Sequence, residues 1–117
     1  MHNKFAKEIW DTFESIHEGD KKVKAAKLQV YRTQFENIKM NEEEDVASLF
    51  LRVAEIVNNM EALGETIREC VIVQNILRSL PSRFNPKVSS IEETTDWEKL
   101  TMNQLLGNLT AYEMRLP

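Results

Sequence analysis

The stretch from Asp45 to Leu63 carries the clearest helical pattern in the chain. At 100° per residue, its large apolar residues gather within roughly 140° of one face, the width typical of a helix packed on a core. These residues are Val46, Leu49, Phe50, Val53, Ile56, Val57, Met60 and Leu63. Acidic residues precede the stretch, where a helix N-terminus favours negative charge, and Gly64 follows it as a stop. The pattern predicts a helix of about five turns that needs apolar partners.

The next predicted helix, residues 66–80, supplies one of these partners. Thr66 and Glu69 fit a capping box at its start. Pro81 ends it, because the residue before a proline is disfavoured in the helical region. One face of this helix is expected to meet the preceding helix. The predicted core therefore includes Phe50, Val53, Ile56, Val57, Leu77 and Leu80.

Two leading helices are predicted before residue 41. The first covers residues 3–17, with Trp10 and Phe13 on its apolar side, and Gly19 closes it. The second covers residues 20–40, with Asp20 as its N-cap. It carries two apolar stripes, which predicts contact with two neighbours.

The C-terminal part is less regular and then helical again. Pro86 suits the first position of a short helix over residues 86–93. Trp97 and Leu100 are expected to pin the following connector to the core. Thr101, with Gln104 three residues later, predicts a capping box for a last helix over residues 101–116. The expected fold is all-α, a compact bundle of about five main helices plus one short helix.

The composition fits one domain over residues 1–117. A single cysteine, Cys70, excludes an internal disulfide and suits a reducing compartment; its place on an apolar helix side predicts a buried, inert thiol. No apolar run approaches the roughly 20 residues of a membrane span, and the N-terminus does not resemble a signal peptide. We therefore expect a cytoplasmic protein with no membrane partner.

The charge balance argues against this chain as a main nucleic-acid binder. Its net charge is −4, and only the first 40 residues lean basic. A basic cluster opens the second predicted helix: Lys21, Lys22, Lys24 and Lys27. Its first interpretation is a solvated face, and weak, non-specific RNA contact is the alternative.

No catalytic, cofactor-binding or metal-binding residue is predicted. The two histidines, His2 and His17, lack partners at metal-ligand spacing. There is no glycine-rich phosphate loop and no nucleophile elbow. The acidic run from Glu42 to Asp45 is interpreted as a solvated helix N-terminus. We expect neither a cofactor nor a small-molecule substrate, and the chain is not predicted to be an enzyme.

Five stretches, in order along nearly the whole chain, together resemble the Gag polyprotein of plant copia-type long-terminal-repeat (LTR) retrotransposons. They are Ala6-Lys-Glu-Ile-Trp-Asp11, Leu28-Gln-Val-Tyr-Arg-Thr-Gln-Phe-Glu36, Glu44-Asp-Val-Ala-Ser-Leu-Phe-Leu-Arg-Val53, Ile76-Leu-Arg-Ser-Leu-Pro-Ser-Arg-Phe84 and Leu109-Thr-Ala-Tyr-Glu-Met114. The resemblance implies a structural protein that self-associates into cytoplasmic virus-like particles around the element's RNA.

The same resemblance implies a plan similar to the C-terminal-type lobe of a retroviral capsid. The predicted helices of residues 41–117 match that lobe in order, with two further helices in residues 1–40. Gag proteins of this type usually continue into a zinc knuckle that binds RNA, and this sequence ends at Pro117 without one. Specific RNA binding is therefore assigned to no residue.

Self-association is expected through the outer side of the helix over residues 66–80, because capsid lobes commonly pair through the corresponding helix. The expected interface residues are Ile67, Arg68, Val71, Ile72 and Asn75. Cover by the first or second helix of the same chain is the structural alternative, and Trp10 with Phe13 is the alternative interface. The alternative function is a helical adaptor, or a host-recruited Gag remnant, that binds a protein partner or RNA.

Overall fold

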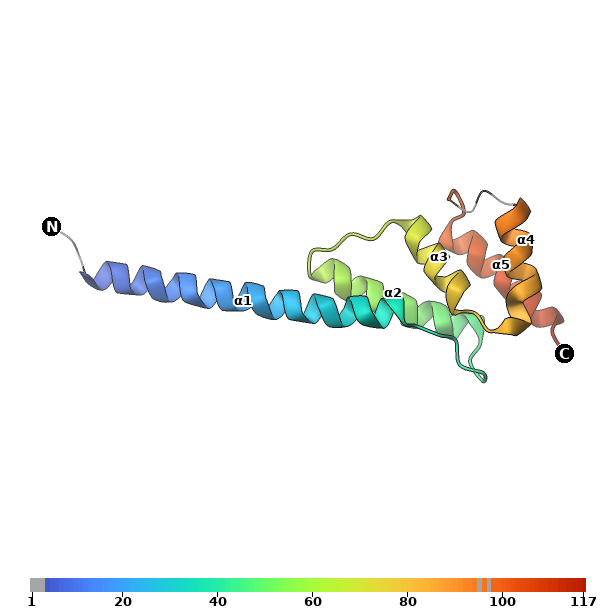
Figure 1. The fold of residues 1–117 in the computed structure, drawn as a ribbon, viewed down its shortest axis with the longest axis horizontal. Coiled ribbons are helices and arrows are strands. Elements are labelled where there is room, and N and C mark those ends of the chain that lie inside the picture. The colour runs from blue at the N-terminus through green and yellow to red at the C-terminus, as the bar shows by residue number, and fades with distance from the viewer. Residues whose placement is uncertain (1–3, 95, 97) are drawn as a thin grey trace.

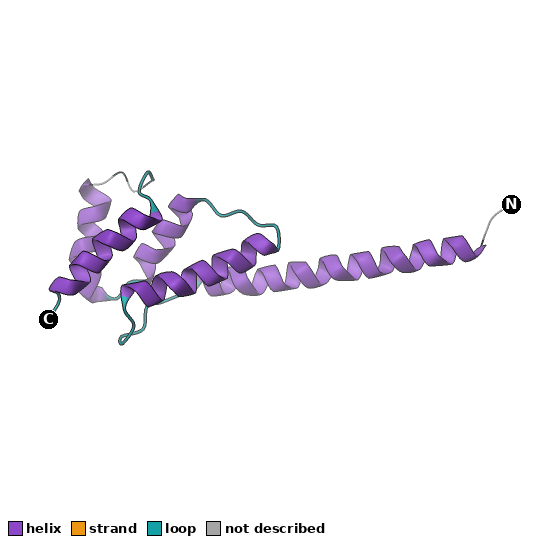
Figure 2. Cartoon of the chain, turned by 180° about the vertical axis from the view of Figure 1, so that it is seen from behind, coloured by secondary structure: helices purple, strands orange, loops and turns teal. Residues whose placement is uncertain are grey.

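The computed structural model describes residues 4–94, 96 and 98–117, so the expectations for His2 and Trp97 lie outside the described residues. Across the described ranges the chain forms α-helices and one 3₁₀ turn, without a strand (Figure 2). The elements are α1 (Lys4–Glu36), α2 (Val46–Ala62), α3 (Glu69–Ser79), η1 (Ser82–Phe84), α4 (Asn85–Thr94) and α5 (Met102–Arg115). The all-α prediction is confirmed, whereas the likeness to a capsid lobe stays a prediction.

Helix α1 makes the molecule long rather than compact. Its 33 residues span about 50 Å. Figure 1 shows its N-terminal part projecting away from the other helices, and every residue from Lys4 to Lys27 is exposed. The radius of gyration is 21.1 Å, against about 13 Å for a compact domain of this length. The chain thus has a body, residues 28–117, and an arm, residues 4–27.

The prediction of two leading helices is wrong, because α1 runs without a break through Gly19. Gly19 does not have a positive φ, and Asp20 lies inside the helix rather than at its cap. A glycine costs a helix roughly 1 kcal/mol, which weakens it without ending it. The body makes no contact with α1 at Gly19 that would require a turn there. The prediction of a single domain over residues 1–117 remains untested.

Helix α2 is the centre of the body and keeps its predicted face. The Asp45 carboxylate accepts a hydrogen bond from the Ser48 amide at 2.8 Å and so caps its start. At its end, Gly64 takes a φ of 95°, and the Glu65 amide bonds to the Met60 carbonyl at 3.1 Å. This pattern is a Schellman motif, which glycine favours because a left-handed backbone strains other residues. The predicted glycine stop is confirmed.

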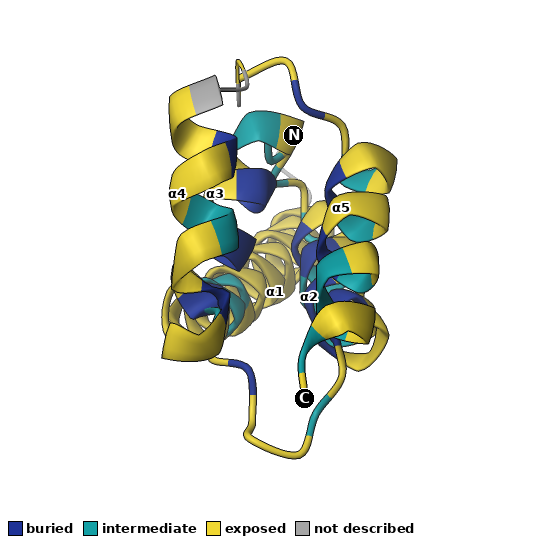
Figure 3. Ribbon diagram, turned by 90° about the vertical axis from the view of Figure 1, so that its right-hand side faces the viewer, coloured by how far each residue is buried: buried dark blue, intermediate teal, exposed yellow. Residues whose placement is uncertain are grey.

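The core lies among the C-terminal part of α1, α2, α3 and α5, where α2 packs against α1 and α5, and α3 packs against α5 (Figure 3). Of the expected core residues, Phe50, Val53, Val57 and Leu77 are buried, while Ile56 and Leu80 are half-buried at the core edge. Further fully buried side chains of α2, α3, η1 and α5 complete it: Leu49, Val73, Ile76, Phe84, Leu105 and Leu109. The apolar stripe of α2 therefore contacts segments that come before it and after it in the sequence.

Helix α3 starts later than predicted. It begins at Glu69, and the cap residue, Arg68, makes no side-chain cap bond, so the expected capping box of Thr66 and Glu69 is wrong. Residues 63–68 instead form a non-helical connector that begins with the turn at Gly64, and an ion pair between Glu65 and Arg32 ties this connector to α1. Leu80 adopts an extended ψ of 142° before Pro81, as expected.

The C-terminal elements close the body. Helix α4 runs one residue beyond each end of the predicted short helix, and Leu100 is buried as expected. At α5, the Thr101 hydroxyl accepts from the Gln104 amide at 3.1 Å and the Gln104 side chain accepts from the Thr101 amide at 3.0 Å. This confirms the predicted capping box. Glu113 of α5 also accepts a bond from the Val46 amide at 2.9 Å, which ties α5 to the start of α2.

Candidate interaction surfaces

The acidic run before α2 is not only a solvated helix N-terminus, because one of its side chains forms an ion pair that stabilises the fold. Arg52 donates to both Glu44 carboxylate oxygens, from Nε at 2.6 Å and from Nη2 at 2.7 Å, and Nη2 also donates to the Lys39 carbonyl at 2.7 Å. The Glu44 side chain is only 8% exposed. The Arg52 guanidinium therefore holds the pKa of Glu44 below its ordinary value. This ion pair fixes the loop between α1 and α2.

Among the described residues, no group of three or more histidine, cysteine or acidic side chains could hold a metal ion. His17 lies on the arm, where its ring stacks on Phe13 with centroids 6.4 Å apart. Cys70 is half-buried, so the expectation of a buried thiol is wrong. Within the described ranges, no helix combines the length and apolar character that a membrane span requires.

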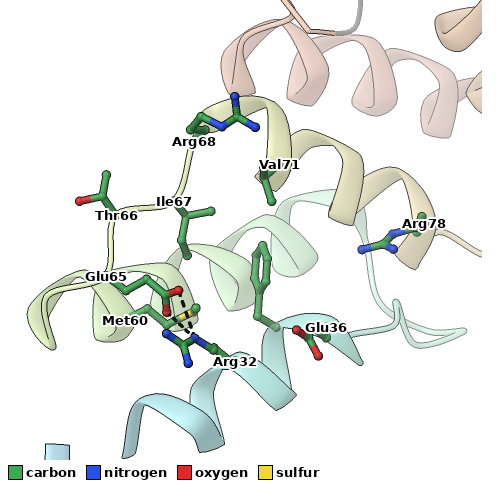
Figure 4. Close-up of a pocket in the computed structure, with 10 residues that line it drawn as sticks. Arg32, Glu36, Met60, Glu65, Thr66, Ile67, Arg68, Val71 and Arg78 are labelled. Carbon is green, nitrogen blue, oxygen red and sulfur yellow. Dashed lines mark hydrogen bonds and ion pairs between the residues drawn. The ribbon is translucent and has the colours of Figure 1, made fainter. Parts of the chain in front are cut away.

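A pocket of about 440 Å³ lies between the end of α1, the connector 63–68 and α3 (Figure 4). Arg32 forms one wall, and its Nε donates to both Glu65 oxygens at 3.1 and 2.9 Å. In Figure 4, Ile67 and Val71 point toward α1, whereas Thr66 and Arg68 point away from it. The pocket therefore combines an apolar floor with a charged rim.

The predicted self-association face is split by this arrangement. Ile67, Arg68 and Val71 line the pocket, and Val71 is 36% exposed. Ile72 and Asn75 are buried, so placing these two on an outer surface is wrong. The last turn of α1 covers that side of α3, as the structural alternative supposed.

The buried Asn75 shows why this side of α3 belongs to the monomer. Its Nδ2 donates to the Phe35 carbonyl at 2.7 Å, and its Oδ1 accepts from Arg78 Nη2 at 3.1 Å. A carbonyl in the last turn of a helix has no partner within the helix. Asn75 supplies that partner and so anchors α1 to α3.

The alternative interface on α1 is open to solvent. Trp10 is 59% and Phe13 61% exposed, and their ring centroids lie 6.1 Å apart. Further apolar side chains on the arm are also more than half exposed: Phe5, Ile9, Ile16 and Val23. Monomeric proteins rarely expose a contiguous apolar surface of this kind, and such surfaces mark interaction sites. The arm is therefore the stronger candidate surface.

The lysine cluster also lies on the arm. Lys21, Lys22, Lys24 and Lys27 are all exposed, on the part of α1 nearest the body. Glu8, Asp11, Glu14 and Glu18 precede them on the same helix. The arm thus has an acidic outer half and a basic inner half.

Dividing α1 at Gly19 concealed a pattern that extends across both halves. Ile9, Ile16, Val23 and Val30 recur every seven residues along the unbroken helix. A count of apolar positions carried through Gly19 would have found this repeat in the sequence.

Comparison with known proteins gives one family. A family model described as "gag-polypeptide of LTR copia-type" matches residues 1–117, the whole chain. No curated protein and no solved structure matches the chain at a significant level.

Proposed function

Because the chain belongs to the gag-polypeptide family of copia-type LTR elements, we propose that it is a subunit that self-associates into virus-like particles around the element's RNA. The observation that carries this proposal is the arm. Its apolar side chains are exposed along residues 4–27 of α1, a part of the helix that contributes nothing to the core of the body. A second protein surface is the simplest cover for such a helix.

The known role of the family supports a structural rather than a catalytic function. Two ion pairs of the described body join different parts of the chain: Arg52 of α2 pairs with Glu44 of the preceding loop, and Arg32 of α1 pairs with Glu65 of the connector 63–68. Both contacts stabilise the fold, and the first of them engages Glu44 of the acidic run before α2.

RNA contact is proposed to be weak and independent of sequence. The lysines of the arm can meet phosphates, but the net charge of −4 opposes close approach to RNA. Assembly in the cytoplasm, around RNA made available there, completes the proposal.

Mass measurement in solution tests the proposal. Light scattering over a wide range of protein concentration should show dimers and larger species that grow with concentration. Adding element RNA, or an unrelated RNA of equal length, should promote assembly equally, and salt should weaken the effect because phosphate contacts release counterions. A strict monomer at every concentration, with and without RNA, would contradict the proposal.

The pocket favours a second candidate function, a helical adaptor that binds a protein partner. Its apolar floor of Ile67 and Val71, with Arg68 and Arg78 at the rim, suits a short apolar peptide with an acidic residue. Fluorescence anisotropy with such peptides should show saturable binding that Arg68→Glu weakens. Equal binding by the wild type and by Arg68→Glu would remove the pocket as the site.

A further inference from the structure

A stripe of uncharged side chains runs along α1 with a seven-residue period. β-Branched residues occupy every seventh position, and small residues lie between them. We call this stripe the seam, and it consists of Ile9, Thr12, Ile16, Gly19, Val23, Ala26 and Val30. Spacings that alternate between three and four residues are typical of a two-helix coiled coil, and the seam extends over three heptads.

The seam is open along its whole length. Ile9 is 55%, Ile16 61%, Val23 52% and Val30 56% exposed. Val30 is exposed even though it lies within the body and its neighbour Tyr31 packs against the core. The seam therefore faces away from the side of α1 that contacts α2, and a second helix can lie on it without displacing the body.

The seam carries no polar group that burial would leave unpaired. Thr12 is its only side chain with a hydrogen-bonding group, and the Thr12 hydroxyl already donates to the Glu8 carbonyl at 2.9 Å. Thr12 can therefore enter an interface without losing a hydrogen bond to water.

We propose that the seam pairs with the seam of a second copy of this chain as an antiparallel two-helix coiled coil. Ile16 then faces Gly19 of the second copy, Ile9 faces Ala26, and Val23 faces Thr12. This inference rests on the proposed self-association and names its surface and its orientation.

Packing favours the antiparallel orientation. In the register above, each layer between residues 9 and 26 joins a larger side chain, Ile9, Ile16 or Val23, to a smaller one, Ala26, Gly19 or Thr12, so the layers have similar volume and the axes can approach evenly. In a parallel pair, Ile16 would meet Ile16 and Gly19 would meet Gly19. Wide and empty layers would then alternate, and such voids are destabilising because buried surfaces lose their contacts.

Charge favours the same orientation. In the antiparallel register, Glu8, Asp11 and Glu14 come level with Lys27, Lys24 and Lys21 of the second copy. The acidic half of each arm thus lies beside the basic half of the other. A parallel pair would place acid beside acid and lysine beside lysine. The helix axes of such a pair are about 8–10 Å apart, a distance close to the screening length in physiological salt.

Pairing also explains how the arm gains stability in water. Residues 4–27 make no contact with the core, and an isolated helix of this kind is marginal because nucleation is unfavourable. Burying the seam supplies the tertiary contact that the monomer lacks.

Sedimentation of the full chain tests the surface with two matched variants. Ile16→Lys places a charge in the seam, whereas Trp10→Lys places one on a side chain of nearly equal exposure, 61% against 59%, that lies off the seam. Ile16→Lys should be monomeric at concentrations where the wild type is dimeric, since each substitution acts twice in a two-fold pair. Trp10→Lys should stay dimeric. Circular dichroism should show both bodies folded, because neither residue belongs to the core.

Cysteine crosslinking tests the orientation. In a Cys70→Ser background, one chain carries Ile9→Cys and another carries Ala26→Cys. Oxidation of the mixture should give a mixed disulfide in high yield, because these positions face each other within disulfide reach in the antiparallel register. Either chain oxidised alone should remain uncrosslinked. Efficient crosslinking of Ile9→Cys with itself would overturn the antiparallel pair.

The outcomes separate this inference from the proposed function. A wild type that stays monomeric overturns both. Association that persists in Ile16→Lys, or that is lost in Trp10→Lys instead, overturns the seam and leaves self-association standing. A seam-dependent dimer that never grows into larger species supports the seam and contradicts particle assembly.

Discussion

At the scale of single residues, side chains far apart in sequence complete the helix ends. Asn75 pairs with the Phe35 carbonyl, and Glu113 pairs with the Val46 amide. A local pattern predicts a cap only when the partner lies within a turn, as at Thr101 and Gln104. The long-range partners could not be predicted because they depend on which helices meet.

The buried Asn75 should contribute measurably to the stability of the fold, which its polar side chain alone does not indicate in the sequence. Asn75→Ala leaves the Phe35 carbonyl buried without its partner, which should lower the free energy of unfolding by about 1–3 kcal/mol. Chemical denaturation measures the change. Gln74→Ala, at the exposed neighbouring position, is the control and should stay within about 0.5 kcal/mol of the wild type. Equal effects of the two substitutions would show that the bond contributes nothing.

Glu44 should make stability depend on pH at the acidic end. Because Arg52 lowers the pKa of folded Glu44, its contribution is fully present above the ordinary value of 4.5 and is lost as the pH falls through the lower folded value. Between pH 7 and pH 3, the wild type should lose more stability than Glu44→Gln. Thermal unfolding at several pH values measures this. Glu43→Gln, which removes an exposed charge of the same loop, should retain the wild-type dependence.

At the scale of elements, the sequence predicted best where a helix has one apolar face and local caps. Helices α2 and α5 fit that description: the predicted face of α2 lies in the core, and the predicted capping box of α5 is present. On α3, apolar and amide side chains occur on two sides, and a helical wheel does not reveal that the end of α1 covers the second. On α1, Gly19 resembled a stop, although no tertiary contact there requires a turn.

Gly19 should accept a side chain without strain. Nothing lies within 4 Å of a Cβ built at this position, so Gly19→Ala should strengthen α1 by roughly 0.8–1 kcal/mol in helix propensity. Hydrogen exchange of the arm amides should slow accordingly. Gly64→Ala is the contrasting variant, since its φ of 95° strains any side chain and should destabilise the body. Faster exchange in Gly19→Ala would indicate that the arm bends at this residue.

At the scale of the whole molecule, the arm and the body are stabilised by different interactions. The body is held by its core, and the arm by helix propensity and whatever covers its seam. The sequence indicated the apolar character of both. It could not indicate that only one of them is buried in the monomer, because amphipathic patterns for internal and external partners are the same.

Removal of the arm should therefore leave the body folded. A chain that starts at Leu28 retains every residue that the structure describes as buried, so its thermal midpoint should change little relative to the full chain under conditions where that chain is monomeric. Differential scanning calorimetry compares the two. A large fall in the midpoint of the shortened chain would show that the arm supports the body through contacts of its own.

The unbroken backbone from Gly19 into the core couples the direction of the arm to the body. Asn75 grips the helix at Phe35, and between that point and Val30 each residue turns the helix by 100° and advances it by 1.5 Å. The direction in which the seam faces, relative to the body, is therefore set by the number of residues in between. Loss of a single residue there would leave both surfaces intact and swing one about 100° around the other. Evolution can thus change the angle between neighbouring subunits by altering helix length alone.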